Sequence, residues 1–170
     1  MASRRSPLSE VLRALIQTDD FGVVSIDERF VRVVDSPASG DWSVLYEAAP
    51  GETLFSGCVS GASLLVGSSR CIHCISLADG SCARSIDLGG RTLALAAAPE
   101  SSPILVACVG GDGGTGLALV NWETGEHGVL EYPKELQPEV LCFIQSRTDQ
   151  SCAKDLFVWL RVGGSGGWVG

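Results

Sequence analysis

The chain has 170 residues, of which 45% are hydrophobic and 19% are charged, and its formal net charge is −8. This composition excludes a disordered chain, and the negative charge argues against a general nucleic-acid binder, which needs a basic face for phosphate contacts. No apolar run reaches the roughly 20 residues that span a bilayer, so we expect no membrane association. The 21 glycines lie between strand-like runs, as in all-β proteins with many tight turns.

The first apolar segment allows two interpretations. A short helix over Ser9–Gln17 would gather four apolar side chains on one face, with Ser9 as its cap. Alternatively, Val11–Gln17 is the first strand of a sheet, and we favour the strand because the repeat described below requires one there. The arginines near the N-terminus also allow a mitochondrial transit peptide as an alternative.

An apolar strand pattern occurs three times, and each copy is followed by a glycine turn and a second strand. The copies are Arg29–Asp35, Arg70–Ser76 and Thr115–Asn121. Their anchor residues Val34, Ile75 and Val120 are 41 and 45 positions apart, and we expect all three to be buried between sheets. A period of about 40 to 45 residues built from short strands is typical of a β-propeller, in which each repeat is one four-stranded blade.

The predicted fold class is therefore an all-β propeller of four-stranded antiparallel sheets in an incomplete ring. The predicted blades span residues 11–48, 53–88, 92–132 and, incompletely, 140–170. In the last blade, Val140–Gln145 and Leu156–Val162 are the predicted strands, with a linker at Pro133–Pro138 before them. The outer edge of Leu156–Val162 has no predicted partner. A ring closes with about four to eight blades, so we expect this chain to self-associate or to need further blades.

The segment Arg29–Asp35 resembles the third strand of the WD-repeat family, in which a basic residue opens an alternating strand that ends in Trp-Asp. Val34 stands where the Trp usually is, and Asp35 stands at the Asp. The strand ends and turns at 75–82 and 120–126 resemble the same motif. The resemblance covers residues 20–132 well and 140–170 in part. A quinoprotein-like or other propeller family is the alternative.

This resemblance implies a non-catalytic scaffold that binds a protein or peptide partner through the loops on one propeller face. No blade keeps the Trp-Asp pair, and no Gly-His dipeptide occurs in the chain. The buried His–Asp hydrogen-bond network of the family is therefore not available in its usual form.

Two motifs suggest a cofactor- or metal-binding enzyme as the alternative function. Cys71-Ile72-His73-Cys74 has a C-x-x-C spacing, but no second pair is present, and residues 71 and 74 of a strand point to opposite faces. Residues 111–116 match G-x-G-x-x-G, but a strand pattern follows them where dinucleotide binding needs a helix. We therefore expect core packing and a turn, respectively, with no metal, no cofactor and no catalytic residue.

The candidate partner-binding site is a basic rim. Arg29 and Arg70 stand just before the third strands of two successive blades, and Arg91 stands near the start of the next blade. Equivalent loops of a propeller gather on one face, so the three arginines would form a rim on an otherwise acidic body. The alternative is that they are ordinary solvated residues beside turns. The odd number of cysteines, seven, favours reduced thiols and a cytoplasmic or nuclear protein. A fragment without independent function is a third interpretation.

Overall fold

A computed structural model describes most of the chain as β-strands. The residues described are 11–18, 20–34, 40–98, 102–111, 114–130, 136–148, 151–162 and 168–169. Within these ranges the strands form three four-stranded sheets and one three-stranded sheet, and every neighbouring pair is antiparallel. The described part of the chain contains no helix long and apolar enough to cross a membrane.

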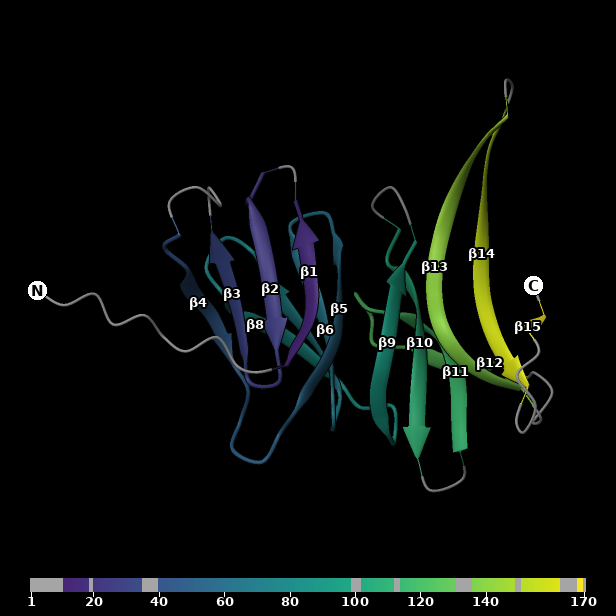
Figure 1. Ribbon diagram of the computed structural model, residues 1–170, viewed down its shortest axis with the longest axis horizontal. Helices are drawn as coiled ribbons and strands as arrows, with labels where there is room; N and C mark the ends of the chain where they lie inside the picture. The colour runs from purple at the N-terminus through teal and green to yellow at the C-terminus, as the bar shows by residue number, and fades with distance from the viewer. Residues whose placement is uncertain are drawn as a thin grey trace, which may run out of the picture.

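Each four-stranded sheet takes its strands in chain order, from one edge to the other (Figure 1). The first sheet contains β1 (Leu12–Gln17), β2 (Val23–Asp27), β3 (Phe30–Val34) and β4 (Ser43–Glu47). The second contains β5 (Leu54–Ser60), β6 (Ser63–Ser68), β7 (Ile72–Ser76) and β8 (Cys82–Ile86). The third contains β9 (Arg91–Ala97), β10 (Ile104–Gly111), β11 (Gly114–Asn121) and β12 (His127–Leu130).

The segment that allowed either a helix or a strand is a strand. β1 pairs with β2 from Leu12 to Gln17, with a register irregularity between Leu12 and Ala14. The strand is favoured because the backbone groups of β1 pair along the edge of β2, which a helix would leave unpaired. The proposed cap, Ser9, lies outside the described residues.

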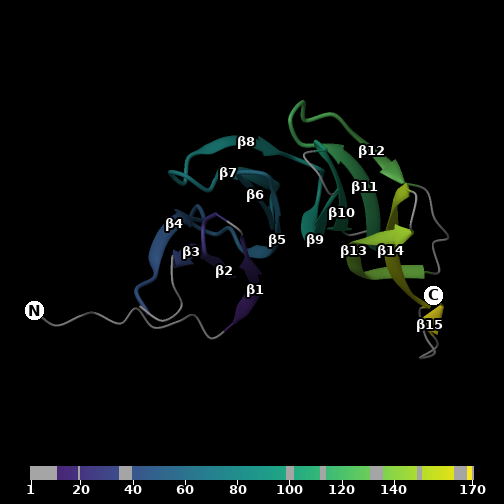
Figure 2. The same ribbon diagram turned by 90° about the horizontal axis from the view of Figure 1, so that it is seen from above.

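The first strands of the sheets stand next to one another, so the sheets follow a curve like the blades of a ring (Figure 2). β1 contacts β5, β5 contacts β9, and β9 contacts β13 (Leu136–Thr148). β4, β8 and β12 lie at the opposite edges of their sheets. This is the arrangement of propeller blades that the repeat predicts.

Apolar side chains from both faces of the second sheet bury it between its neighbours. Leu64, Val66 and Ile75 pack with residues of the first sheet, whereas Leu65 and Ile72 pack with residues of the third. This alternation is the period of two that places successive side chains of a strand on opposite faces. Both faces of the second sheet are therefore part of the core.

The three anchor residues are buried, as predicted. Val34, Ile75 and Val120 are 1%, 0% and 0% exposed and belong to β3, β7 and β11, the third strands of their sheets. Ile75 packs between the first and second sheets, and Val120 packs between the second and third. Asp35, which stands at the WD-repeat Asp, lies outside the described residues.

In the last sheet, both predicted strands are longer than the prediction. β13 begins at Leu136 rather than Val140, so part of the predicted linker Pro133–Pro138 is strand. Pro138 is accommodated because the register shifts between it and Val140, and a proline without an N–H is tolerated at such irregularities. β14 (Ser151–Val162) pairs with β13 over their whole length.

The prediction that the outer edge of Leu156–Val162 has no partner is wrong. β15 (Trp168–Val169) pairs with that edge of β14 at Leu160 and Arg161. A short antiparallel strand of this kind satisfies backbone groups that an open edge leaves unpaired.

The glycine-rich run forms a hairpin, as predicted. β10 ends at Gly111 and β11 begins at Gly114, and these two residues are paired across the hairpin. Because an antiparallel strand follows the run, no helix N-terminus is placed to bind a pyrophosphate. The run therefore connects two strands of a blade.

Candidate functional site on one loop face

The chain between β4 and β5 makes a tight turn at Ala49-Pro50-Gly51-Glu52. The Glu52 amide donates to the Ala49 carbonyl at 3.0 Å, and Gly51 has φ +77°. Proline at the second position and a positive φ at the third are typical of a type II turn, for which glycine is suited. The turn leads from the first sheet into the second.

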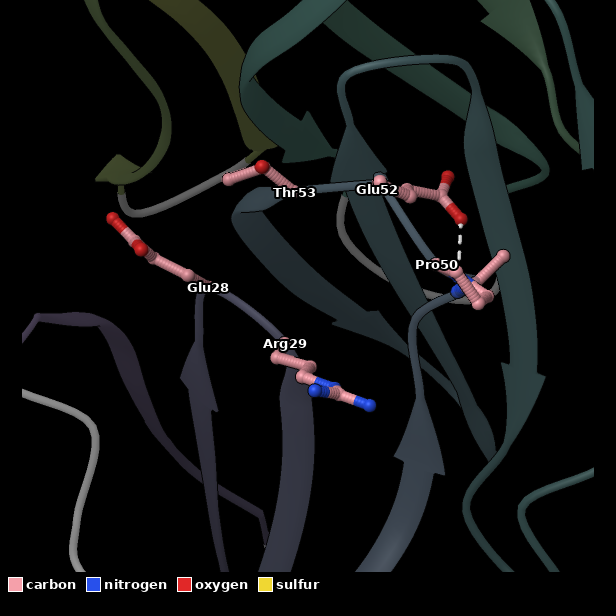
Figure 3. A pocket seen from close by; sticks show the side chains of 7 residues that line it. Glu28, Arg29, Pro50, Glu52 and Thr53 are labelled. Atoms are coloured by element: carbon pink, nitrogen blue, oxygen red, sulfur yellow. Dashed lines mark hydrogen bonds between the residues drawn. The ribbon is translucent and has the colours of Figure 1, made fainter.

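A pocket of about 360 Å³ lies between this turn and the β2–β3 turn (Figure 3). It is lined by Glu28, Arg29, Ala49, Pro50, Gly51, Glu52 and Thr53. Two backbone hydrogen bonds hold its walls together, because the amides of Ala48 and Leu54 donate to the carbonyls of Arg29 and Glu28. The volume falls in the range of small ligand sites, and both walls are loops at the junction of two sheets.

Arg29 of the predicted rim lines this pocket, but its guanidinium already forms an ion pair within the first sheet. Its Nη2 atom lies 2.6 Å from Glu47 Oε1, and the two side chains are 62% and 50% exposed. The ion pair holds the guanidinium at the pocket wall. An exposed pair of this kind contributes little to stability.

Arg70 and Arg91 lie at the same end of the sheets. A Cβ atom added to Gly51 would lie 3.9 Å from Arg70 Nη2, so Arg70 stands beside the turn that forms the pocket wall. Thr92, next to Arg91, would meet a Cβ atom added to Gly67 at the end of β6. Within the described residues, neither the Arg70 nor the Arg91 side chain forms an ion pair. The rim residues thus share one face, interspersed with acidic residues.

A buried polar network lies behind the pocket, where the second sheet meets the first. Glu52 Oε1 accepts hydrogen bonds from Ser68 Oγ at 2.6 Å and from His73 Nε2 at 2.8 Å. The other ring nitrogen, Nδ1, lies 3.0 Å from Ser85 Oγ. The His73 and Glu52 side chains are 8% and 3% exposed. The imidazole is also tilted against the Tyr46 ring, with 5.3 Å between the ring centroids.

The network stabilises the charged forms of both partners. Burial opposes the protonated imidazole, but hydrogen bonds to Cys71 and Glu52 and the nearby carboxylate raise the pKa of His73 to about 9. Burial also opposes the Glu52 carboxylate, but hydrogen bonds from Ser68 and His73 lower its pKa below the ordinary value. At neutral pH the pair is therefore an imidazolium and a carboxylate. Burial and the neighbouring Glu52 raise the pKa of Tyr46 to about 12.

The C-x-x-C motif does not converge, as the strand geometry predicts. Cys71 Sγ lies 3.5 Å from His73 Nε2, whereas Cys74 belongs to the core on the other face of β7, where its Sγ lies 3.9 Å from the Trp122 carbonyl. Burial raises the pKa of the Cys74 thiol to about 11, as expected for a thiol that packs as a small hydrophobe. Among the cysteines whose side chains are described, those at 58, 71, 74 and 82 are free thiols.

The sequence analysis did not identify Glu52 as a site residue. Glu52 comes from the linker between the first and second sheets, whereas Cys71 and His73 lie within the second sheet, and 21 positions separate Glu52 from His73. The signal in the sequence was an acidic residue directly after a Pro-Gly turn and before an apolar strand. That signal indicates a turn, and the buried position of the carboxylate follows from the packing of the first two sheets.

Comparison with known proteins supports the fold. No protein-family model matches the sequence, and no curated protein sequence matches it significantly. Among solved structures, the chain is similar to a chain of the mitotic checkpoint complex, with a TM-score of 0.58 and 16% identity over 84% of this chain. It is also similar to a prolyl endopeptidase, with a TM-score of 0.51 and 15% identity over 89% of this chain. The match spans 49% of the first protein and 24% of the second. At these identities the likeness shows the fold alone, a β-propeller architecture.

Proposed function

We propose that this chain is a non-catalytic interaction module that binds an acidic protein segment or peptide on the loop face bearing the pocket. The observation that carries the proposal is the pocket between the β2–β3 turn and the Pro50-Gly51 turn, with Arg29 in its wall and Arg70 beside it. One of the two similar structures is a chain of the mitotic checkpoint complex, which is a protein assembly, and this supports a protein partner.

The chemistry of the pocket favours binding over catalysis. Among the described residues, its lining contains no histidine or cysteine, and Glu52 directs its carboxylate to the buried network. A Ser–His or Cys–His pair of the kind used in covalent catalysis is therefore absent from the described lining.

The charges favour an acidic partner. The Arg29 guanidinium is already paired with Glu47, but Arg70 and Arg91 are exposed and, among the described residues, form no ion pair. A carboxylate of a partner can pair with either guanidinium. A peptide whose acidic side chains reach Arg70 and Arg91 fits this face.

Binding of a panel of fluorescent peptides to the 170-residue chain, followed by anisotropy, tests the proposal. Acidic peptides should bind more tightly than basic peptides of the same length. Arg70→Gln and Arg91→Gln should each weaken binding about 2- to 5-fold, as exposed ion pairs do, and should reduce its salt dependence. The control is Arg84→Gln, because Arg84 lies on the outer strand β8 and donates to the Thr124 carbonyl of the third sheet. Equal effects of all three variants, or no preference for acidic peptides, would contradict the proposed site.

A further inference from the structure

One group of side chains contains atoms that could bind a metal ion and that the proposed peptide binding does not use. Glu52, Cys71 and His73 each offer one ligand atom, and these atoms all lie within 4.8 Å of one another. The three residues are 8%, 9% and 7% exposed. Carboxylate oxygen, thiolate sulfur and imidazole nitrogen are the ligand atoms that zinc takes in proteins.

We propose that Glu52, Cys71 and His73 bind a zinc ion. Metal–ligand bonds of about 2.0 to 2.3 Å in a tetrahedron place ligand atoms about 3 to 4 Å apart. His73 Nε2 lies 2.8 Å from Glu52 Oε1 and 3.5 Å from Cys71 Sγ, so small side-chain adjustments admit the ion. A water molecule takes the fourth position, as in zinc sites with three protein ligands.

Neighbouring hydrogen bonds orient two of the three ligands, His73 and Glu52. His73 Nδ1 lies 3.0 Å from Ser85 Oγ, which can accept its proton, so that Nε2, which now lies 2.8 Å from Glu52 Oε1, is the ring nitrogen that binds the ion. Glu52 Oε2 accepts from the Ala49 amide at 3.4 Å, so that Oε1 faces the site. Outer hydrogen bonds of this kind fix the tautomer and orientation of metal ligands.

The sequence alone argued against zinc because it contains no second cysteine pair. The fold removes this objection, because it supplies Glu52 from the β4–β5 linker and pairs Cys71, the residue before β7, with His73 of β7 instead of with Cys74. Cys71 Sγ lies 3.5 Å from His73 Nε2, so this pair can bind one ion.

Binding has a defined proton balance. Zinc replaces the proton that the imidazolium shares with Glu52, and a thiol at Cys71 also loses its proton when sulfur becomes a ligand. The affinity of the chain for zinc should therefore rise with pH, and the protein should release protons when zinc is added. A metal-free hydrogen-bond network predicts neither effect.

Competition between the full chain and a chromogenic chelator for Zn²⁺, in a thiol-free reductant, tests the site. We expect one equivalent of zinc for the wild type and for Cys74→Ser and Cys82→Ser. Cys74 lies on the other face of β7, and Cys82 Sγ lies beside the distal ring nitrogen, 3.9 Å from Nδ1. Cys71→Ser and Glu52→Gln should each weaken binding at least about 100-fold, and Ser85→Ala about 10-fold.

Circular dichroism establishes that each variant is folded. If Cys71→Ser or Glu52→Gln does not fold, cobalt substitution of the wild type decides instead, because a thiolate ligand gives a sulfur-to-cobalt charge-transfer band and a tetrahedral site gives intense visible bands. The proposal is overturned if the wild type binds no stoichiometric zinc, if Cys71→Ser binds as tightly as the wild type, or if the cobalt form lacks the thiolate band.

Discussion

Arg32 of β3 and His73 of β7 occupy equivalent positions in neighbouring sheets, 41 residues apart, and each is paired with a buried carboxylate. Arg32 pairs with Asp27, which ends β2 and also accepts from the amides of Arg29 and Phe30. Burial opposes the Asp27 carboxylate, but these hydrogen bonds and Arg32 lower its pKa.

In the second sheet, different residues form the corresponding buried pair. Ser68 stands where Asp27 stands in the first sheet, and it likewise accepts from two amides of the following turn, at Arg70 and Cys71. A serine carries no charge, so the carboxylate comes from Glu52 in the preceding linker. Both sheets thus contain a buried pair of a basic and an acidic side chain, although the acidic residue stands at a different position of the repeat in each.

Glu52→Gln should destabilise the chain strongly. Removing one partner of a buried ion pair leaves an unpaired charge, which costs about 3 to 5 kcal/mol. Urea unfolding in the presence of a chelator measures the loss. The matched control is Glu47→Gln, because Glu47 forms an exposed pair with Arg29 and its loss should cost less than about 1 kcal/mol. Similar effects of the two substitutions would mean that the Glu52–His73 pair contributes no more than a surface pair.

Stability should fall as the pH rises from about 6.5 to about 9. The folded-state pKa of His73 is raised from 6.5 to about 9, so the pair's contribution is fully present below the unfolded-state value and disappears as the pH passes the folded value. The expected loss is up to about 3 kcal/mol. Urea unfolding at a series of pH values, with a chelator present, measures it. His73→Gln should flatten the profile in this interval, and an unchanged slope would assign the effect to another group.

The sequence predicts the blades well because their signals are local. Strand length, the glycine turns and the burial of Val34, Ile75 and Val120 all follow from alternation within short segments and from the repeat period. The extent of β13 was missed because a proline normally indicates a break, whereas here an irregular register accommodates Pro138.

The candidate site depends on contacts between segments, which local patterns do not contain. Cys71, the residue before β7, lies beside His73 of that strand, and their proximity could be predicted from their spacing. The third member, Glu52, reaches them because the β4–β5 linker folds back over the end of β6, where Ser69 N donates to the Thr53 carbonyl. No periodicity in the sequence encodes that path.

Gly80→Ala should be far more harmful than Gly61→Ala. Both glycines have positive φ, +73° and +58°, which costs an L-residue about 1 to 2 kcal/mol. A Cβ atom at Gly80 would in addition lie 2.1 Å from the Leu45 carbonyl oxygen of β4, whereas a Cβ atom at Gly61 meets nothing within 4 Å. Thermal unfolding should therefore show a clear excess loss for Gly80→Ala. Equal losses would mean that the β7–β8 turn does not pack against the first sheet.

The isolated 170-residue chain should self-associate through the face of β1 that bears the exposed side chains of Leu12 and Leu15. This face is called the open side of β1 below. Leu12 and Leu15 are 58% and 61% exposed, whereas the neighbouring Ile16 would contact a Cβ atom at Gly57 of the second sheet. Burying each leucine against another surface gains about 1.5 to 3 kcal/mol. Sedimentation velocity over a range of concentrations should therefore show association, and a double Leu12→Lys, Leu15→Lys variant should weaken it at least about 10-fold because charges on an open strand oppose pairing. Val44→Lys is the control, since Val44 is also exposed, at 56%, but lies on the outer strand β4. A wild type that stays monomeric at all concentrations would show that this side of β1 does not drive association.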